Sequence, residues 1–583
     1  MSTRTPTAKK PFFAPKSIEC LRGYSSTQFF ADLTSGVTVG IVALPLAMAF
    51  AIASGVKPEA GIITAVIAGF IISALGGSRV QIGGPTGAFI IIVFGILAKY
   101  GAANLAICTM MAGLMLLAMG LLRLGSAIKF IPYPLTMGFT SGIAVLIFST
   151  QVKDFFGLSV STVPAEFLGK VRVLGANIAS LQWPTLALAV ISLLLIVFWP
   201  RKWARRVPGS IIALVLGTAL VMVFQFPVET IGSRFGGIPQ GLPSLAWPAL
   251  SWETIQHLFP PAFTIALLAA IESLLSAVVA DGMIDDRHDS NQELMAQGIA
   301  NLVCPLFGGI AATGAIARTA TNVKNGGRTP IAGMVHSITL LLILLIAAPL
   351  AKFVPLATLS AVLVVVAFNM GEWHHFKRLA HWPQSDALVF LVAFGLTVLV
   401  DLTVAVAVSM VVATVLFIKQ VSETTEITTV DESSDTEGSQ HSLVGKEIPQ
   451  GVLVFRLFGA FFFGATDKLE AALASAHREP KILILRMRKL LAMDASGLNA
   501  LEDLLAKLRR KGGHLILSAP HTQPYLMMDK AGFIAELGAE NVCPNIDAAL
   551  QRARRLLDKL NSPSPSLTPC SMKNEMTVRS TAL

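Results

Sequence analysis

The chain has 583 residues, of which 54% are hydrophobic and only 14% are charged, and its mean hydropathy is +0.67. A soluble domain carries about 25% charged residues, so this composition excludes a soluble globular protein and predicts that lipid solvates most of the chain. The net charge of +10 does not indicate nucleic-acid binding, because much of it lies in short loops between apolar segments, where basic residues set membrane orientation.

The chain begins with residues that predict a cytoplasmic leader at 1–28. This stretch contains basic side chains but no apolar core before Phe29, which excludes a cleaved signal peptide. The five cysteines are widely spaced and form no C-x-x-C pair. We therefore expect no disulfide framework, no metal site and no cofactor.

Residues 29–421 predict an α-helical membrane domain with fourteen transmembrane segments. Crossing the hydrocarbon core takes about 20 apolar helical residues. An even number of spans places both termini on one side, and the basic loops then lie on that side too, which predicts cytoplasmic termini in an inner membrane. The predicted segments are 31–54, 60–75, 84–99, 104–122, 130–151, 183–199, 209–225, 261–280, 292–306, 314–323, 330–350, 355–370, 386–400 and 402–420.

Two of these segments, 84–99 and 314–323, are too short or too rich in glycine to cross alone. Residues 78–93 (SRVQIGGPTGAFIIIV) and 307–321 (FGGIAATGAIARTAT) share one order of glycines, a short extended piece and a helix start. They occupy the third position of two seven-span halves, which is typical of a 7+7 inverted repeat with a binding site between the interrupted helices. The alternative is that the glycines only allow helices to pack closely.

Arg318 lies inside the second interrupted segment. A charge at mid-bilayer costs at least about 2.5–3.5 kcal/mol. The free N–H groups at the start of a helix attract anions, and a guanidinium adds donors that fit an oxyanion or a carboxylate. We therefore predict an anion site at Arg318. Its available donors are the hydroxyls of Thr86, Thr313 and Thr319 and the amides of Gly87, Ala88 and Ala317. The alternative is a structural salt bridge without a ligand.

Glu272 is the one charge of the apolar stretch 261–280, and Ser276 lies one turn away. A buried carboxylate without a fixed cation can take up and release a proton at physiological pH. The sequence leaves three roles open for Glu272: carrying a coupling proton, binding sodium together with hydroxyl oxygens, or pairing permanently with Arg318.

The acidic segment 281–293 is interpreted as a solvated loop with an N-cap for the next helix, rather than as a metal site. The chain shows no nucleophile–base pair and no metal-ligand spacing, so the sequence does not predict an enzyme. Residues 422–450 are polar and acidic and predict a linker. Residues 451–560 alternate strands and helices, which predicts a small cytoplasmic α/β domain, and 561–583 predicts a disordered tail.

Within the α/β domain, the motif AMDASG (492–497) ends a strand and opens a helix. Asp494 or Ser496 is expected to cap that helix. Ser496 is also a candidate phosphorylation site, because a helix N-terminus tolerates added negative charge.

The chain resembles the sulfate permease (SulP) family of anion transporters over residues 15–560, most closely its bacterial members that take up C4-dicarboxylates. The resemblance implies a core domain that moves against a gate domain, a homodimer, and a C-terminal STAS domain with a cytosolic protein partner. The stretches that carry it are 36–56 (GVTVGIVALPLAMAFAIASGV), 76–89 (GGSRVQIGGPTGAF), 131–145 (IPYPLTMGFTSGIAV), 270–283 (AIESLLSAVVADGM), 307–327 (FGGIAATGAIARTATNVKNGG) and the domain after the linker.

The resemblance also implies positions for the site. Coupling is expected at Glu272 and Ser276, and phosphorylation at Ser496. Two departures from the family pattern, Leu46 and Ala317, remove polar groups, which weakens the case for sulfate and favours a carbon-bearing anion. Substrate binding is expected at Phe50, Pro85, Thr86, Gly87, Ala88, Ala317 and Arg318.

The sequence therefore predicts a secondary active anion transporter that works by alternating access. Its substrate is expected to be a C4-dicarboxylate or an inorganic oxyanion such as sulfate or bicarbonate, taken up with a proton. The alternatives are a sodium-coupled bicarbonate transporter and an anion-sensing membrane receptor that signals through its STAS domain.

Overall fold

The computed structural model describes residues 13–126, 131–160, 163–200, 208–239, 241, 245–249, 251–400, 402–429, 443, 446–475 and 480–561. The predicted tail lies outside the described residues apart from Asn561, and so do much of the predicted linker and the basic loop at 201–207. The chain divides into two units, Met1–Ala413 and Thr414–Leu583. Each unit is described by itself.

The first unit is helical, apart from two short strands described below. Each segment expected to cross the membrane overlaps at least one of its helices, and the segments 84–99 and 314–323 begin in the two strands. The helices are α1 (Lys16–Leu21), α2 (Ser26–Ala53), α3 (Pro58–Leu75), η1 (Gly87–Phe89), α4 (Ile90–Leu121), α5 (Tyr133–Phe156), α6 (Phe167–Ala176), η3 (Ile178–Ser180), α7 (Trp183–Phe198), α9 (Gly209–Phe224), α10 (Ile231–Phe235), α11 (Trp252–Ile284), α12 (Ser290–Val303), η4 (Cys304–Phe307), α13 (Ile316–Lys324), α14 (Pro330–Ala351), α15 (Leu356–Met370), α16 (Trp373–Arg378), η5 (Leu379–His381), α17 (Gln384–Leu399) and α18 (Leu402–Thr424), the last of which enters the second unit.

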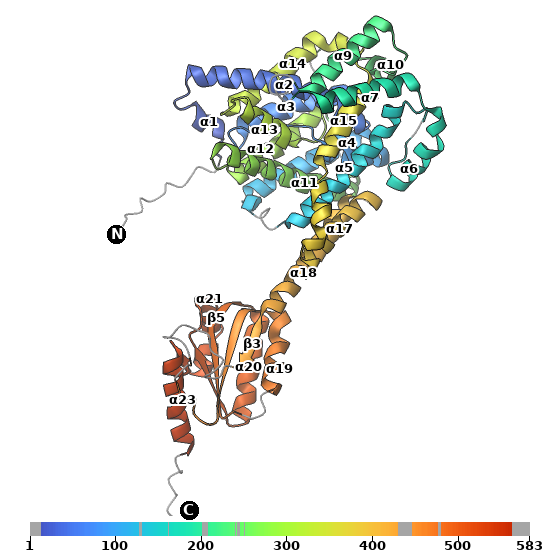
Figure 1. Cartoon of the computed structure of the whole chain (residues 1–583). Helices are drawn as coiled ribbons and strands as arrows, with labels where there is room; N and C mark the ends of the chain where they lie inside the picture. Colours follow the sequence, from blue (N-terminus) through green and yellow to red (C-terminus); the bar gives the residue numbers. More distant parts are fainter. Residues whose placement is uncertain are drawn as a thin grey trace, which may run out of the picture. The chain divides into compact units, whose positions relative to one another are not determined.

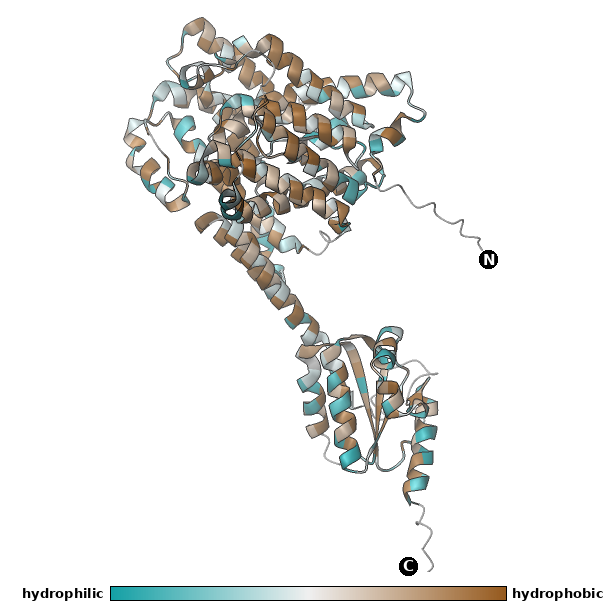
Figure 2. Ribbon diagram, turned by 180° about the vertical axis from the view of Figure 1, so that it is seen from behind, coloured by the Kyte–Doolittle hydropathy of each residue, from teal (hydrophilic) through white to brown (hydrophobic). Residues whose placement is uncertain are grey.

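The apolar composition of these helices suits a bilayer. Among the described residues, eight helices are long and apolar enough to cross a membrane, and three shorter apolar helices accompany them. Figure 2 shows the same helices coloured as hydrophobic along most of their length. The prediction of a polytopic helical membrane protein is confirmed, and the count of fourteen spans stays a prediction.

One helix joins two of the predicted segments. α4 continues from the third segment into the fourth, and the chain turns within it at Gly101, whose φ of 82° and ψ of 172° are not helical. Glycine adopts a positive φ without the steric cost that a Cβ adds. The single residue therefore allows two antiparallel arms to follow each other directly, and the arm before it is the shorter one.

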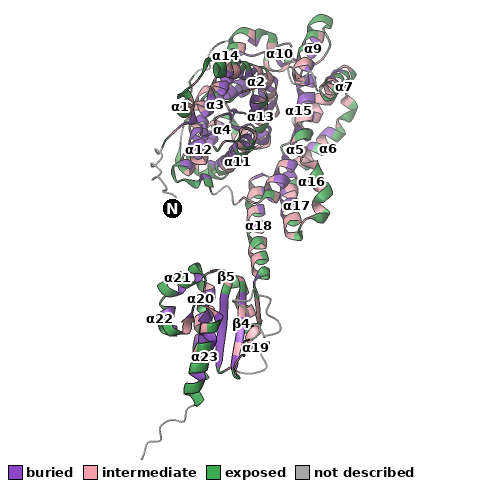
Figure 3. Cartoon of the chain, turned by 60° about the vertical axis from the view of Figure 1, so that its left-hand side comes forward, coloured by how far each residue is buried: buried purple, intermediate pink, exposed green. Residues whose placement is uncertain are grey.

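The helices of the first unit form two bundles, which Figures 1 and 3 show beside each other. The core bundle contains α2, α3, α4, α11, α12, α13 and α14, which pack against one another. The gate bundle contains α5, α7, α9, α15 and α17. One apolar cluster joins them, since it includes Phe50 and Val93 of the core bundle together with Ile147 and Leu363 of the gate bundle.

The second unit contains a five-stranded sheet in the order β3-β4-β5-β6-β7, parallel except for β3. Leucine, phenylalanine and methionine side chains from the strands and from α20 form its main core, and Figure 3 shows β4 and β5 as largely buried. The elements are β3 (Glu426–Thr429), β4 (Val452–Phe461), η6 (Phe463–Ala465), α19 (Thr466–Ser475), β5 (Ile482–Met493), α20 (Ala495–Arg510), β6 (His514–Ser518), α21 (Thr522–Lys530), α22 (Phe533–Leu537), η7 (Ala539–Asn541), β7 (Val542–Cys543) and α23 (Ile546–Asn561).

The segment expected as a linker contributes to this sheet. Residues Glu426–Thr429 form β3 and pair antiparallel with β4, from Glu426 opposite Phe458 to Thr429 opposite Phe455. The sequence EITT is short and three of its four residues are polar, so its composition resembles a loop. It becomes a strand because the edge of β4 offers unpaired backbone groups.

Candidate functional site

The two interrupted segments meet inside the core bundle. β1 (Gly83–Gly84) pairs antiparallel with β2 (Thr313–Gly314), so the pieces expected to be extended form a two-residue ladder. All four residues are buried. The glycines are needed for this approach, because a Cβ on Gly314 would lie 2.1 Å from Nε2 of Gln81.

A helix begins directly after each strand. η1 leads into α4 on one side, and α13 follows β2 on the other. The residues that precede them, Thr86 and Ala315, make no side-chain capping hydrogen bond. Uncapped N–H groups at a helix start carry partial positive charge and are free to bind an anion. At the start of α13, the residues Ile316 and Ala317 are exposed.

Arg318 lies in the first turn of α13 and is 4% exposed. Its Nη1 donates to the carbonyl oxygen of Gly83 at 3.4 Å, and its Nη2 donates to the carbonyl oxygen of Pro85. Gly84 makes room for the guanidinium, because a Cβ there would lie 2.6 Å from Nη1. The arginine thus ties the two interrupted segments together, while its charge has no acidic partner among the described residues.

Glu272 projects from α11 toward the first half-helix. Its Oε2 accepts a hydrogen bond from Oγ1 of Thr86 at 3.2 Å, and both side chains are only half-buried. The Glu272 carboxylate forms no ion pair with Arg318 in the described part of the chain. This geometry speaks against the permanent pair and leaves the proton and sodium roles open.

Hydroxyl groups join α11 to the second interrupted segment. Oγ of Ser276 donates to Oγ1 of Thr319 at 3.4 Å, and Oγ of Ser273 lies 2.7 Å from Oγ1 of Thr313. Thr319 also accepts from the backbone N–H of Ile82 at 3.0 Å. The hydroxyl of Ser276 therefore makes its hydrogen bond within the core bundle, one helical turn away from Glu272.

The remaining predicted positions lie around the same point. Phe50, Pro85 and Ala88 are buried, and Phe50 and Ala88 belong to the apolar cluster shared by the two bundles. Gly87 faces the gate bundle, since a Cβ there would lie 2.8 Å from Sδ of Met370 and 3.3 Å from Cδ1 of Ile147. The predicted site residues thus lie where the core and gate bundles meet.

The sequence did not single out two buried polar residues near the interrupted segments. His336 of α14 is 0% exposed, and both of its ring nitrogens lack a hydrogen-bond partner. Glu293, within the segment expected to be solvated, is buried and accepts from the backbone N–H groups of Gly77 and Ser78. A signal for Glu293 was available, because it is the fourth residue of α12, whose predicted N-cap is formed by Asp289.

The sequence also indicated no role for a cluster of one glutamate and two histidines in the connection between α15 and α17. Glu372, His374 and His375 place potential metal-binding atoms within 4.8 Å of one another. His375 is buried, and its Nε2 lies 3.0 Å from the hydroxyl of Tyr133. Neighbouring histidines in a predicted loop are common in sequences and do not by themselves indicate a metal site. Only the spatial grouping of these three residues identifies them as a cluster.

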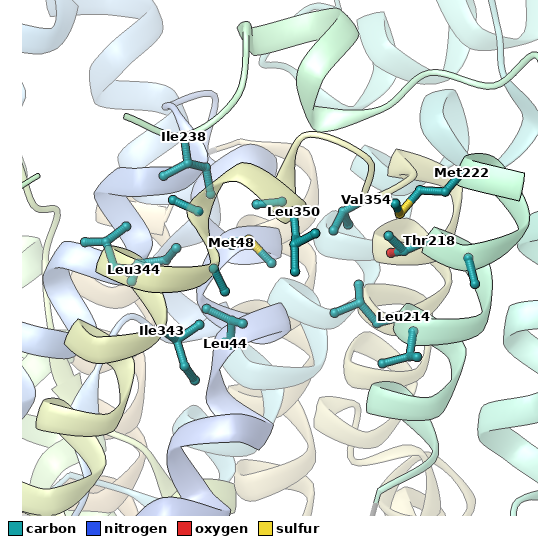
Figure 4. Close-up of a pocket in the computed structure, with 16 residues that line it drawn as sticks. Leu44, Met48, Leu214, Thr218, Met222, Ile238, Ile343, Leu344, Leu350 and Val354 are labelled. Carbon is teal, nitrogen blue, oxygen red and sulfur yellow. The ribbon is translucent and has the colours of Figure 1, made fainter. Parts of the chain in front are cut away.

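A separate cavity of about 350 Å³ lies between α2, α9 and α14. Figure 4 shows apolar side chains around it, among them Met48, Leu214 and Leu344, with Thr218 supplying a hydroxyl. Neither Arg318 nor Glu272 lines this cavity. An anion would lose its hydration there without compensation, so the cavity is not the anion site.

In the second unit, Asp494 caps α20 by accepting from the backbone N–H of Gly497 at 2.8 Å. Ser496 is half-buried in the first turn of that helix and lines a cleft of about 550 Å³ between α19 and α20. Capping therefore falls to Asp494, and phosphorylation of Ser496 stays a prediction.

Comparisons with known proteins agree with this architecture. Residues 29–393 match the sulfate permease family, and residues 444–549 match the STAS domain. YvdB of Bacillus subtilis (strain 168) is 43% identical over 523 residues, which cover 89% of this chain and 97% of YvdB. The bicarbonate transporter BicA of Picosynechococcus is 35% identical over 455 residues, 75% of this chain and 79% of BicA.

Among solved structures, the murine Slc26a9 anion transporter in the inward-facing state aligns with a TM-score of 0.82. The alignment covers 95% of this chain and 96% of that chain, at 18% identity. At this identity the likeness concerns the fold, including the presence of both the membrane unit and the sheet-containing unit.

Proposed function

The chain belongs to the sulfate permease family, whose relatives named above include transporters of anions, and on that premise we propose that it takes up a small carboxylate or oxyanion with a coupling proton. The observation that supports this proposal most is the meeting of two uncapped half-helix N-termini beside Arg318. Such an arrangement stabilises negative charge inside a membrane without a metal.

In this proposal the anion binds at the N-terminus of α13 and at η1, where the backbone N–H groups of Gly87, Ala88 and Ala317 donate to it. The Arg318 guanidinium supplies positive charge and positions the two segments. Phe50 and Pro85 form the apolar side of the site. Thr86 donates to the anion or to Glu272, to which it is bonded here at 3.2 Å.

We favour a carbon-bearing anion over sulfate. Ala317 brings no hydroxyl to the start of α13, and the described surroundings contain few side-chain donors besides Thr86 and Arg318. Bicarbonate carries a single charge and needs fewer donors than sulfate, the carbon chain of a C4-dicarboxylate suits an apolar lining, and BicA is named as a bicarbonate transporter. Sodium-coupled bicarbonate uptake is the second candidate, because the carboxylate of Glu272 also suits a hard cation.

We place the transporter in the inner membrane with both termini in the cytoplasm, as the basic loops require. We further propose a homodimer, and a regulatory or assembly role for the STAS domain through a cytosolic protein partner. The alternative of an anion-sensing membrane receptor is tested by the same uptake measurement, since a receptor would bind the anion and transport none.

The experiment is uptake into proteoliposomes. Labelled succinate, bicarbonate and sulfate are offered with and without a pH gradient, and with and without sodium, against unlabelled competitors. We expect accumulation of succinate or bicarbonate that depends on the pH gradient, and its loss in Arg318→Ala. Uptake that persists in a folded Arg318→Ala protein would overturn the proposed site.

The proton role is tested separately by Glu272→Gln, which keeps an acceptor for the Thr86 hydroxyl and removes the titrating group. We expect uptake to lose its response to the pH gradient while exchange of anion at equal pH persists. Glu253→Gln, at the exposed start of the same helix, is the matched control. An unchanged gradient response in Glu272→Gln would exclude Glu272 as the proton carrier.

A further inference from the structure

Lys170 is a buried cation that the proposed site does not use. It lies on α6, in the connection between α5 and α7, and is 1% exposed. Its Nζ lies 5.7 Å from the centre of the Phe94 ring. Within the described part of the chain, the ammonium of Lys170 has no hydrogen bond and no ion pair, whereas the backbone N–H of this residue donates to the carbonyl oxygen of Glu166.

The contact with Phe94 crosses between the two bundles. α6 packs against α5 and α17 of the gate bundle, whereas Phe94 belongs to α4 of the core bundle. Phe94 also covers Gly55, where a Cβ would lie 3.3 Å from Cδ2 of the ring. The pair therefore closes the end of the bundles at which α2 terminates, which is the outer end in the proposed orientation.

Phe94 lies on the half-helix whose N-terminus belongs to the predicted anion site. Phe94 follows Gly87 by seven residues on the same half-helix, which at 1.5 Å per residue is about 10 Å along the axis. Between them, Val93 and the gate residue Ile147 belong to one buried apolar cluster. The contact between Lys170 and Phe94 therefore lies on the outer side of the predicted anion site, with buried apolar residues between the two.

An unpaired ammonium is costly in such a place. Burial lowers the pKa of Lys170 to about 8, because the charged form loses water and gains no counter-charge. The cation–π contact with Phe94 offsets only part of this cost. A transporter that alternates access must open its outer end, and opening this end separates Lys170 from Phe94.

We propose that Lys170 is an outer anion-binding site, which is sealed by Phe94 in the present conformation and binds the incoming carboxylate or oxyanion when the bundles part at the outer end. This inference rests on the proposed function. The anion supplies the counter-charge that the ammonium lacks, so binding favours the outward-open conformation before the anion passes to the half-helix termini.

The test compares the two sides of the membrane. Initial rates are measured in right-side-out and inverted vesicles with labelled succinate or labelled bicarbonate, whichever the wild-type protein carries. Lys170→Met preserves side-chain length and removes the charge. We expect KM to rise about tenfold in right-side-out vesicles and to stay within about twofold in inverted vesicles, since loss of one charge-assisted contact affects only the outer encounter.

Two variants serve as controls. Lys57→Met removes a lysine at the same end whose side chain is 72% exposed, and we expect its KM to match that of the wild type. Lys170→Arg keeps the charge and should restore most of the outer affinity. If Lys170→Met does not reach the membrane, Lys170→Gln is compared with Lys170→Arg in the same way.

The outcomes separate the two proposals. A wild-type protein that moves none of the anions contradicts the proposed function itself. If the wild type transports and Lys170→Met behaves like Lys57→Met, or raises KM equally on both sides, the outer site is refuted while the proposed function stands.

Discussion

At the scale of single residues, Arg318 does two things that its sequence position does not reveal. Its guanidinium donates to backbone carbonyls of Gly83 and Pro85, which lowers the cost of burying a charge in the membrane. Those bonds neutralise no charge, so the positive field remains for a ligand. The alternative of a salt bridge with Glu272 is not realised, because the Glu272 carboxylate accepts from Thr86 instead.

Gly84→Ala should be harmful, because the added Cβ would meet Nη1 of Arg318 and the residue has a φ of 143°. Displacement of the guanidinium and backbone strain together should destabilise the folded protein by about 1–3 kcal/mol and strongly reduce uptake. The measurement is thermal unfolding of the purified protein together with proteoliposome uptake.

Gly95→Ala on α4 is the matched control for Gly84→Ala, since a Cβ at Gly95 meets nothing within 4 Å. It should leave both stability and uptake close to the wild-type values. Equal behaviour of the two variants would mean that the approach of Arg318 to Gly84 is not required.

At the scale of elements, the two half-helices share an arrangement that places their uncapped N-termini at one point. β1 and β2 pair over two residues, and α11 bonds to both segments through Thr86, Thr313 and Thr319. A continuous helix would have satisfied its own backbone groups and left none for a ligand. The interruption is thus the source of the binding groups.

Ile316→Asp tests this electrostatic role. Ile316 is the first residue of α13 and is 39% exposed, so the new carboxylate would occupy the positive helix terminus. We expect KM for the transported anion to rise at least about tenfold, because a nearby like charge costs several kcal/mol at low dielectric. Concentration dependence of uptake is the measurement.

Ile316→Asn has nearly the same shape as Ile316→Asp but adds no charge, and it should raise KM much less. If both variants raise KM equally, the effect comes from the loss of the isoleucine side chain and not from the electrostatic field of the helix terminus.

At the scale of the whole molecule, the membrane unit contains every residue of the proposed site, and the second unit contains none. The start of the second unit lies earlier than the sequence indicates, since β3 at Glu426–Thr429 is part of its sheet. A truncation that begins after residue 440 would therefore leave β3 without its partner strand. A cleaner truncation removes residues 425–583.

We expect the chain without residues 425–583 to keep the same order of preference among succinate, bicarbonate and sulfate, because the anion site lies in the membrane unit. Its transport rate or its dimerisation should change, since the STAS domain is proposed to regulate or assemble the protein. A competition panel on full-length and truncated protein at equal membrane abundance checks this. A changed order of preference would place part of the selectivity in the second unit.

The sequence by itself determined the class of the protein, the positions of its apolar helices and the two interrupted segments, and it singled out Arg318 and Glu272 as candidate site residues. These follow from local composition and from the cost of charge in lipid, which any single stretch of sequence displays. The strands β4, β5 and β6 and the helices between them were predictable from the alternation of apolar strand segments with amphipathic helical segments, which is also local.

Only the tertiary structure decided which groups meet. The pairing of Gly83 with Gly314, the bond from Thr86 to Glu272 and the closure of Phe94 over Lys170 all join residues far apart in the chain. The pairing of β3 with β4 and the hydrogen bonds of the buried Glu293 to Gly77 and Ser78 are also contacts between residues far apart in the chain. Hydropathy and spacing describe a residue's own element, whereas these contacts depend on how elements pack against one another, which no local pattern encodes.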